Sequence, residues 1–414
     1  MKIKYSKKTI FLYFVLFCSC FNDILRIPGT GITLFRVLLP FSLIYCLISN
    51  GKRTIKIILF YLIFEMISLL QSLVFAKTND LNIQFSLNRF ILYSFYYLSV
   101  FNILIIVNTL YHLENMYFIS NFLRFYTYLF FVILIIFSIY GVFGFVTVSN
   151  LRIFENVNNY ATKIAAFFPF LFVGVVQRHN KENFILVCIT LYMMFANDCK
   201  ISLIGITVEI IMFIILAKNN IELRYGKLLT FVGIYIMAVF GYFLLNYDIV
   251  LNSYNLTDMT SNLFRGIIHR TLNVNLGTSG NFRLSIMFKG FEWIKKTHLF
   301  GIGIGNAGIL MRRTIPVDGG LVYQNAISLH AFLLEFLLEC GFIAVLVYIM
   351  LIKEIIGCLK RKINGMQMVF LMTFISMWIW GFQPSEMITE YFVIGFLCGL
   401  FLINRKMKRL SLTH

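Results

Sequence analysis

The residues best suited to proton transfer and anion binding gather in and beside one long polar segment, 247–329, of an otherwise apolar chain. His330 follows this segment directly, and an imidazole can accept a proton near neutral pH. Arg283 and Arg265 lie within the segment, and a guanidinium can bind two phosphate oxygens at once. This combination suits a general base that works beside a bound anion such as a diphosphate. A structural role for a single histidine is the competing interpretation.

The rest of the chain predicts helices that cross a membrane. Of the 414 residues 59% are hydrophobic, and the mean hydropathy of +0.83 exceeds what a water-soluble core of this length would bury. The apolar stretches are continuous and long enough to cross about 30 Å of hydrocarbon as helices. We therefore predict an all-α integral membrane protein with about 12 transmembrane helices. The predicted spans are 9–25, 31–49, 57–76, 90–110, 125–146, 161–177, 184–197, 201–217, 228–246, 330–352, 366–381 and 389–404.

The distribution of basic residues predicts how these helices are oriented. If the N-terminus is cytoplasmic, the inner connections hold 21 Lys and Arg, and the short outer loops hold 5. Both termini are then cytoplasmic, and the long segment 247–329 between helices nine and ten lies outside, with short helices expected in it. The chain divides into 1–246 with nine helices, the outer loop 247–329, and 330–414 with three helices and a basic cytoplasmic tail.

Four further cations are predicted close to the outer surface of the membrane. Arg36, Lys163 and Lys200 fall near the outer ends of their helices, and Arg152 lies just outside one. With the arginines of the outer loop they would form a cationic cluster at one depth, which suits a diphosphate. The alternative for each of them is a side chain that extends to the interface, where water solvates its charge.

The carboxylates allow several roles. Glu65 and Glu209 fall near the middle of their spans, where a polar contact between helices is the first interpretation and a proton relay the second. Glu335 and Glu339 share one face of the helix after the outer loop, and we expect them to orient neighbouring cations. Asp23, in the first outer loop, remains a rival to His330 as the base.

Several signatures of other protein classes are missing from the sequence. It has no Walker loop and no dinucleotide-binding fingerprint after a strand, which argues against nucleotide-driven transport and hydride transfer. It also has no Asp-x-Asp pair, with which many nucleotide-sugar transferases hold a metal. The glycine-rich run 301–305 lies in the outer loop and predicts a tight turn. The eight cysteines are scattered, mostly in apolar segments, and suggest neither disulfides nor a zinc site. No metal and no cofactor is expected.

Two blocks of sequence carry a resemblance to a known family. Residues 151–161 place Arg152 before an Asn-rich turn that includes Asn159. Residues 281–306 place Arg283 ahead of a tryptophan and the glycine-rich run. Each block alone is a weak signal, so the resemblance depends on their order along the chain.

A third block completes the pattern at the head of the helix after the outer loop. His330 is followed by Glu339 and Gly341 at a fixed spacing. The three blocks, in this order and on this topology, resemble the O-antigen ligase and polymerase superfamily of bacterial surface-polysaccharide assembly. The chain departs from the family pattern at Leu299, where proline is usual, and at Lys200, where many members have an arginine.

The resemblance implies a metal-independent glycosyltransferase of the bacterial inner membrane, with its site facing the periplasm or the outside. The glycan would pass from an undecaprenyl-diphosphate carrier to an acceptor sugar hydroxyl. The resemblance and the predicted cluster of cations together give the candidate site residues: His330 and Arg283 for catalysis, Arg152, Arg265, Lys200 and Arg36 for diphosphate binding, and Glu339 and Asn159 for support. The implied partners are the lipid-linked oligosaccharide, membrane lipids and a chain-length regulator protein, and no nucleic acid is expected.

Three functions remain in view. A polymerase of repeat units in O-antigen or capsule synthesis is preferred because the chain is rich in Phe, Ile, Lys and Asn, a bias common in sugar-specific polysaccharide clusters. An O-antigen ligase would differ in its acceptor, which would be lipid A-core. A flippase or exporter of lipid-linked glycans would place its charges in a central cavity and lack a large outer domain, so the long loop 247–329 argues against it.

Overall fold

The computed structural model describes the chain at residues 7–21, 25, 32–114, 118, 121, 125, 128, 129, 132, 157–178, 181–196, 200–217, 279–314, 329, 331–359, 365–380 and 391–411. This part of the chain contains helices and no strand. The helices are α1 (Lys7–Cys20), α2 (Leu34–Thr78), α3 (Ile83–Glu114), α5 (Val157–Arg178), α6 (Lys181–Ala196), α7 (Lys200–Ala217), α11 (Ser279–Lys296), α12 (Asn306–Thr314), α13 (Phe332–Cys340), α14 (Phe342–Leu359), α15 (Gly365–Trp380) and α16 (Tyr391–Ser411).

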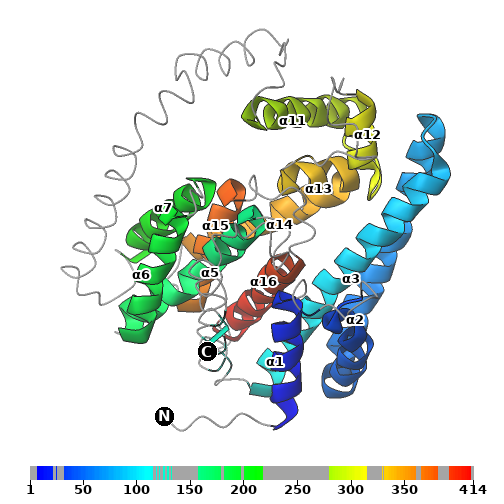
Figure 1. The fold of residues 1–414 in the computed structure, drawn as a ribbon. Coiled ribbons are helices and arrows are strands. Elements are labelled where there is room, and N and C mark those ends of the chain that lie inside the picture. The colour runs from blue at the N-terminus through cyan, green and yellow to red at the C-terminus, as the bar shows by residue number, and fades with distance from the viewer. Residues whose placement is uncertain are drawn as a thin grey trace, which may run out of the picture.

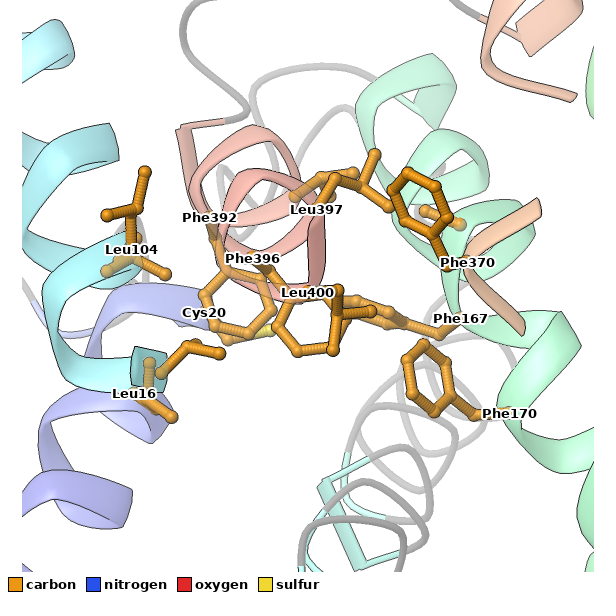
Figure 2. Close-up of a cluster of buried hydrophobic side chains, with 14 of the residues drawn as sticks. Leu16, Cys20, Leu104, Phe167, Phe170, Phe370, Phe392, Phe396, Leu397 and Leu400 are labelled. Atoms are coloured by element: carbon orange, nitrogen blue, oxygen red, sulfur yellow. The ribbon is translucent and has the colours of Figure 1, made fainter. Parts of the chain in front are cut away.

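Seven of the described helices form two groups that meet at α16. Figure 1 shows α1, α2 and α3 on one side of α16 and α5, α6, α7 and α15 on the other. Ring pairs join α16 to α5, with centroids 5.6 Å apart for Phe167 and Phe392 and 5.3 Å apart for Phe170 and Phe396. Figure 2 shows these rings within the buried cluster, with side chains of α1 and α3 on the opposite side of α16. The C-terminal helix therefore links the two groups.

Two glycines allow α16 to pack closely on α3. A Cβ on Gly395 would lie 2.5 Å from the carbonyl oxygen of Val100, and one on Gly399 would lie 2.8 Å from the Cβ of Val107. The spacing of four residues puts both glycines on the same face of α16, as in the small-residue interfaces of membrane helices. The contact depends on backbone surfaces that only small residues expose.

Helix α2 bends sharply at Asn50, which has non-helical dihedral angles (φ −148°, ψ 49°). The Thr54 hydroxyl donates to the carbonyl oxygen of Cys46 at 3.2 Å. In a straight helix these residues would be about 12 Å apart along the axis. The chain therefore changes direction between the two halves of α2.

Both halves of α2 pack against the same part of α3. In the first half, Ser42 accepts a hydrogen bond of 2.9 Å from the amide of Asn102. In the second half, the rings of Phe60 and Phe101 lie 6.1 Å apart. The sequence predicted two helices, 31–49 and 57–76, and the bend separates them, although the predicted connection at 51–56 is helical.

Apolar side chains cover the outward surface of α2. Among the described helices, α2 and α3 are long and apolar enough to cross a membrane. Ile48 of α2 is 81% exposed, and Phe41, Ile63 and Leu70 are also exposed. Such a surface suits contact with lipid. These features agree with an all-α membrane protein, whereas the number of spans and their orientation remain predictions.

The prediction of one continuous helix over 330–352 is wrong, because the helix is interrupted at Gly341. This residue has φ +52° and separates α13 from α14. A Cβ at this position would lie 2.4 Å from the carbonyl oxygen of Leu299. A contact with a distant segment therefore ends α13, and the apolar run alone does not reveal it. The predicted spans 228–246 and most of 125–146 lie outside the described residues.

Candidate functional site

The glycine-rich run packs its backbone directly against three helices. Gly301, Gly303 and Gly305 have φ values of +88°, +81° and +85°, a region that residues with side chains rarely adopt. A Cβ on Gly303 would lie 2.2 Å from the backbone nitrogen of Ser72 on α2. At the other two glycines it would lie 2.7 Å from a backbone atom of α13 and 2.9 Å from one of α3. The tight turn predicted from sequence thus forms a junction between α2, α3 and α13.

Backbone hydrogen bonds join this run to the end of α13. The Ile302 amide donates to the carbonyl oxygen of Leu338 at 3.0 Å, and the Gly303 amide donates to that of Glu339 at 2.9 Å. The carbonyl groups at the end of a helix lack partners within the helix, so these contacts satisfy two of them. The second and third sequence blocks are therefore in direct contact.

The Glu339 carboxylate fixes the start of α12. Its Oε1 accepts from the amides of Gly305 at 2.9 Å and Ala307 at 3.2 Å. The side chain is 1% exposed, and a negative charge at a helix N-terminus is favourable. These two contacts are with backbone donors, and the expected role of Glu339 in orienting cations stays a prediction. Glu339 holds α12 and α13 together.

Asn306 closes the same junction from the side of α2. Its amide nitrogen donates to the carbonyl oxygen of Ile302 at 2.8 Å, and to the carbonyl and hydroxyl oxygens of Ser72 at 3.2 and 3.0 Å. The side chain is fully buried. Nearby, the Gln71 amide donates to the carbonyl oxygen of Phe300 at 2.8 Å. Side chains of α2 and α12 therefore hold the glycine-rich run on both sides.

The turn before the glycine-rich run contains two left-handed residues that are not glycine. His298 has φ +49° and Leu299 has φ +63°. Proline requires φ near −65°, so it is incompatible with the conformation at position 299. The departure from the family pattern at Leu299 thus accompanies a local backbone shape that proline cannot adopt.

A polar chain that the sequence did not predict links α3 to the first turn of α13. Arg89 donates from Nη2 to the Tyr93 hydroxyl at 3.0 Å, and its guanidinium lies 5.0 Å from the centre of the Tyr93 ring. The Tyr93 hydroxyl donates to Oε1 of Glu335 at 3.4 Å. The sequence signal that could have identified Arg89 is its place directly before the apolar span 90–110, in a predicted outer loop with little positive charge.

The segment around position 330 approaches both α11 and α3. Its neighbours Leu329 and Ala331 are buried, and the Glu335 amide donates to the carbonyl oxygen of Ala331 at 2.8 Å. On α11, a Cβ at Gly290 would lie 2.9 Å from the side chain of Leu329. On α3, Tyr93 reaches Glu335. The start of α13 is therefore held by α11 and α3.

The structure places the predicted site residues unevenly. His330, Arg152 and Arg265, and the rival base Asp23, lie outside the described residues. The backbone of Arg283 is placed on α11, that of Lys200 at the start of α7 and that of Asn159 on α5. Arg36 is exposed on the first turns of α2, and Glu339 lies at the junction described above. The cluster of cations therefore remains a prediction.

The two deep glutamates contact serines on neighbouring helices. Oε2 of Glu65 accepts from the hydroxyl of Ser94 on α3 at 2.6 Å. Oε1 of Glu209 accepts from the hydroxyl of Ser376 on α15. These contacts agree with the first interpretation of both glutamates, polar contacts between helices.

The described residues form an all-helical arrangement in which the glycine-rich run packs against the ends of helices. Residues 185–349 match the family model described as O-antigen ligase. This match supports membership of the O-antigen ligase and polymerase superfamily, whose members are bacterial membrane proteins of polysaccharide assembly. No curated protein and no solved structure matches the chain.

Proposed function

We propose that this protein polymerises lipid-linked oligosaccharide repeat units of O-antigen or capsule on the outer face of the bacterial inner membrane. One observation carries the proposal. The glycine-rich run and the end of α13 belong to two different sequence blocks of the resemblance, and they are joined by three hydrogen bonds to Leu338 and Glu339. Both blocks fall within the segment that matches the family model.

In the proposed reaction, a hydroxyl of the acceptor sugar attacks the anomeric carbon of the donor glycan. The new carbon–oxygen bond forms as the bond to undecaprenyl diphosphate breaks, so direct displacement inverts the anomeric centre. His330 takes the hydroxyl proton, a contribution of about 10²–10⁴ in rate for general bases. No metal or nucleotide takes part in this scheme.

The departing diphosphate must be stabilised as its negative charge grows. Arg283 is proposed to act at the leaving group, with further donors supplied by a set of cations predicted at the same depth. That set comprises Arg152, Arg265, Lys200 and Arg36. Glu339 supports the site by holding α12 against α13, which follows His330 closely in the chain. Asn159 is proposed to support the site from α5.

A ligase is the second candidate, because the matching family model is described as O-antigen ligase. The same site would then transfer glycan to lipid A-core. A flippase or exporter of lipid-linked glycans is the candidate from a different class. The proposed location is the inner membrane, with membrane lipids and a chain-length regulator as further partners and no nucleic acid.

Incubation of the purified protein with lipid-linked oligosaccharide alone separates these candidates. A ladder of longer lipid-linked glycans supports the polymerase. Product that forms only when lipid A-core is added supports the ligase, and the absence of product in both reactions rejects both enzymes.

The role of His330 is tested in the same assay. His330→Ala should abolish the ladder at unchanged membrane abundance, and His330→Gln should abolish it too, because glutamine cannot accept a proton near neutral pH. Activity that survives in His330→Gln but not in His330→Ala would assign His330 to substrate positioning. Asp23 would then be the next base to test.

A further inference from the structure

We propose that Arg89 is an additional diphosphate-binding residue, held in place by Tyr93 and Glu335. This inference rests on the proposed function, since it names a ligand contact of the same site. It begins from Glu335, a carboxylate that is only 5% exposed in the first turn of α13. A buried carboxylate is costly unless hydrogen bonds and a nearby cation compensate it.

The chain of contacts supplies that compensation and leads outward to a cation. Tyr93 is 2% exposed and donates to Glu335, while it accepts from Arg89. Arg89 also lies over the Tyr93 ring, so both the ring and the hydroxyl of Tyr93 contact the guanidinium. Tyr93 thus holds the arginine in one orientation, and the carboxylate of Glu335 polarises the contact.

Arg89 lies at the depth of the glycine-rich run. It is the seventh residue of α3, about 9 Å along the axis from the first. A Cβ on Gly305 would lie 3.1 Å from the Cβ of Arg89, so the run packs directly against this part of α3. Arg89 is half-buried, so part of its side chain reaches the surface beside the run.

Arg89 and Arg283 would approach the donor from different helices. α13 begins just after His330, and its first residues pack against α11, which carries Arg283, and contact α3, which carries Arg89. A diphosphate has two charged groups, and two guanidinium groups on separate helices suit it better than one. A monophosphate needs only one of them. Arg89 should therefore contribute to the preference for diphosphate over monophosphate.

Binding of undecaprenyl diphosphate and undecaprenyl monophosphate to the purified protein tests this inference without requiring transfer. Arg89→Ala should weaken diphosphate binding by about 10-fold and monophosphate binding much less. Tyr93→Phe keeps the ring but removes the hydroxyl, so it should lose part of the diphosphate affinity that Arg89→Ala loses. In the double variant, Tyr93→Phe should lower this affinity little further than Arg89→Ala alone. Lys77→Ala removes an exposed cation at the end of α2 and serves as the control.

A purely structural role of Arg89 predicts a different result. If Arg89 only neutralises Glu335, the double variant Arg89→Ala with Glu335→Gln should regain both thermal stability and diphosphate affinity, which would overturn the inference. We expect it to regain stability but not affinity. If Arg89→Ala does not fold, the double variant and Arg89→Lys supply the same comparison. Arg89→Lys should also lose diphosphate selectivity, because lysine cannot bind two phosphate oxygens at once as a guanidinium does.

The outcomes for Arg89 and for the proposed function are distinguishable. Glycan ladders from the wild type, together with unchanged diphosphate binding by Arg89→Ala, would refute the role of Arg89 and leave the polymerase intact. No ladder from the wild type, together with a selective loss of diphosphate binding in Arg89→Ala, would reject the polymerase and retain the anion-binding role.

Discussion

Replacing Gly303 with alanine should separate the glycine-rich run from α2. The new Cβ would lie 2.2 Å from the backbone nitrogen and 2.3 Å from the Cα of Ser72. Both are backbone atoms, so a change of rotamer cannot relieve the clash. Ordinary contact begins at 3.4 Å, so the two segments must move apart by roughly 1.2 Å.

The expected destabilisation has two sources. An alanine at φ +81° costs roughly 1–2 kcal/mol, and overpacking of a close contact adds about 1–3 kcal/mol. Together they predict a loss of about 2–5 kcal/mol. The run is hydrogen-bonded to α13, and His330 lies just before α13 in the chain, so the displacement should also lower activity. A misplacement of about 1 Å can lower a reaction rate by about 10²-fold.

Thermal unfolding of the purified protein and the rate of ladder formation measure these two effects. Gly51→Ala is the matched control, because a Cβ at Gly51 meets no atom within 4 Å and its φ is not positive. The control should keep or slightly raise the unfolding temperature. If Gly303→Ala matches this control in both measurements, the proposed dependence of the site on the junction is refuted.

Two further changes test the leaving-group contact and the packing of α16. Arg283→Lys should lower the initial rate of ladder formation almost as much as Arg283→Ala, by roughly 10–150-fold at equal membrane abundance, because lysine cannot form the bidentate contact. Near-normal chain formation by Arg283→Ala would remove this residue from the mechanism. At the α16 interface with α3, Gly399→Ala and Gly399→Leu should lower the unfolding temperature progressively with side-chain size, since a Cβ would already lie 2.8 Å from Val107. Equal unfolding temperatures for both variants and the wild type would show that close packing there is dispensable.

Hydropathy alone located most of the described helices to within a few residues. The predicted spans 201–217 and 366–381 correspond to Lys200–Ala217 and Gly365–Trp380. Continuous apolar runs bounded by polar residues permit this, because the requirement for internal backbone hydrogen bonding leaves helices as the main option in lipid. The element type was therefore predictable from local composition.

The features that depend on distant contacts were not predictable in this way. The break at Gly341 lies inside an apolar run, and it is set by close approach to Leu299. The contact between Tyr93 and Glu335 joins positions 242 residues apart. The spacing between His330 and Glu339 made Glu339 a candidate site residue. Its bonds to the start of α12 could not be predicted, because they depend on the path of the glycine-rich run. Local pattern identifies such residues, whereas their partners depend on tertiary packing.

The separation along the chain between the two sides of the junction sets an order of assembly during synthesis. Ser72 contacts the carbonyl oxygen of Ile304, 232 residues later. At about 5–20 residues per second, the ribosome needs about 10–50 s to make that interval. During this time α2 and α3 are held together by mutual contacts such as that of Ser94 with Glu65, while Ser72 and Tyr93 await Asn306 and Glu335. A chain truncated before residue 301 would keep this polar face uncovered, which offers membrane quality-control proteases a recognisable difference between unfinished and finished protein.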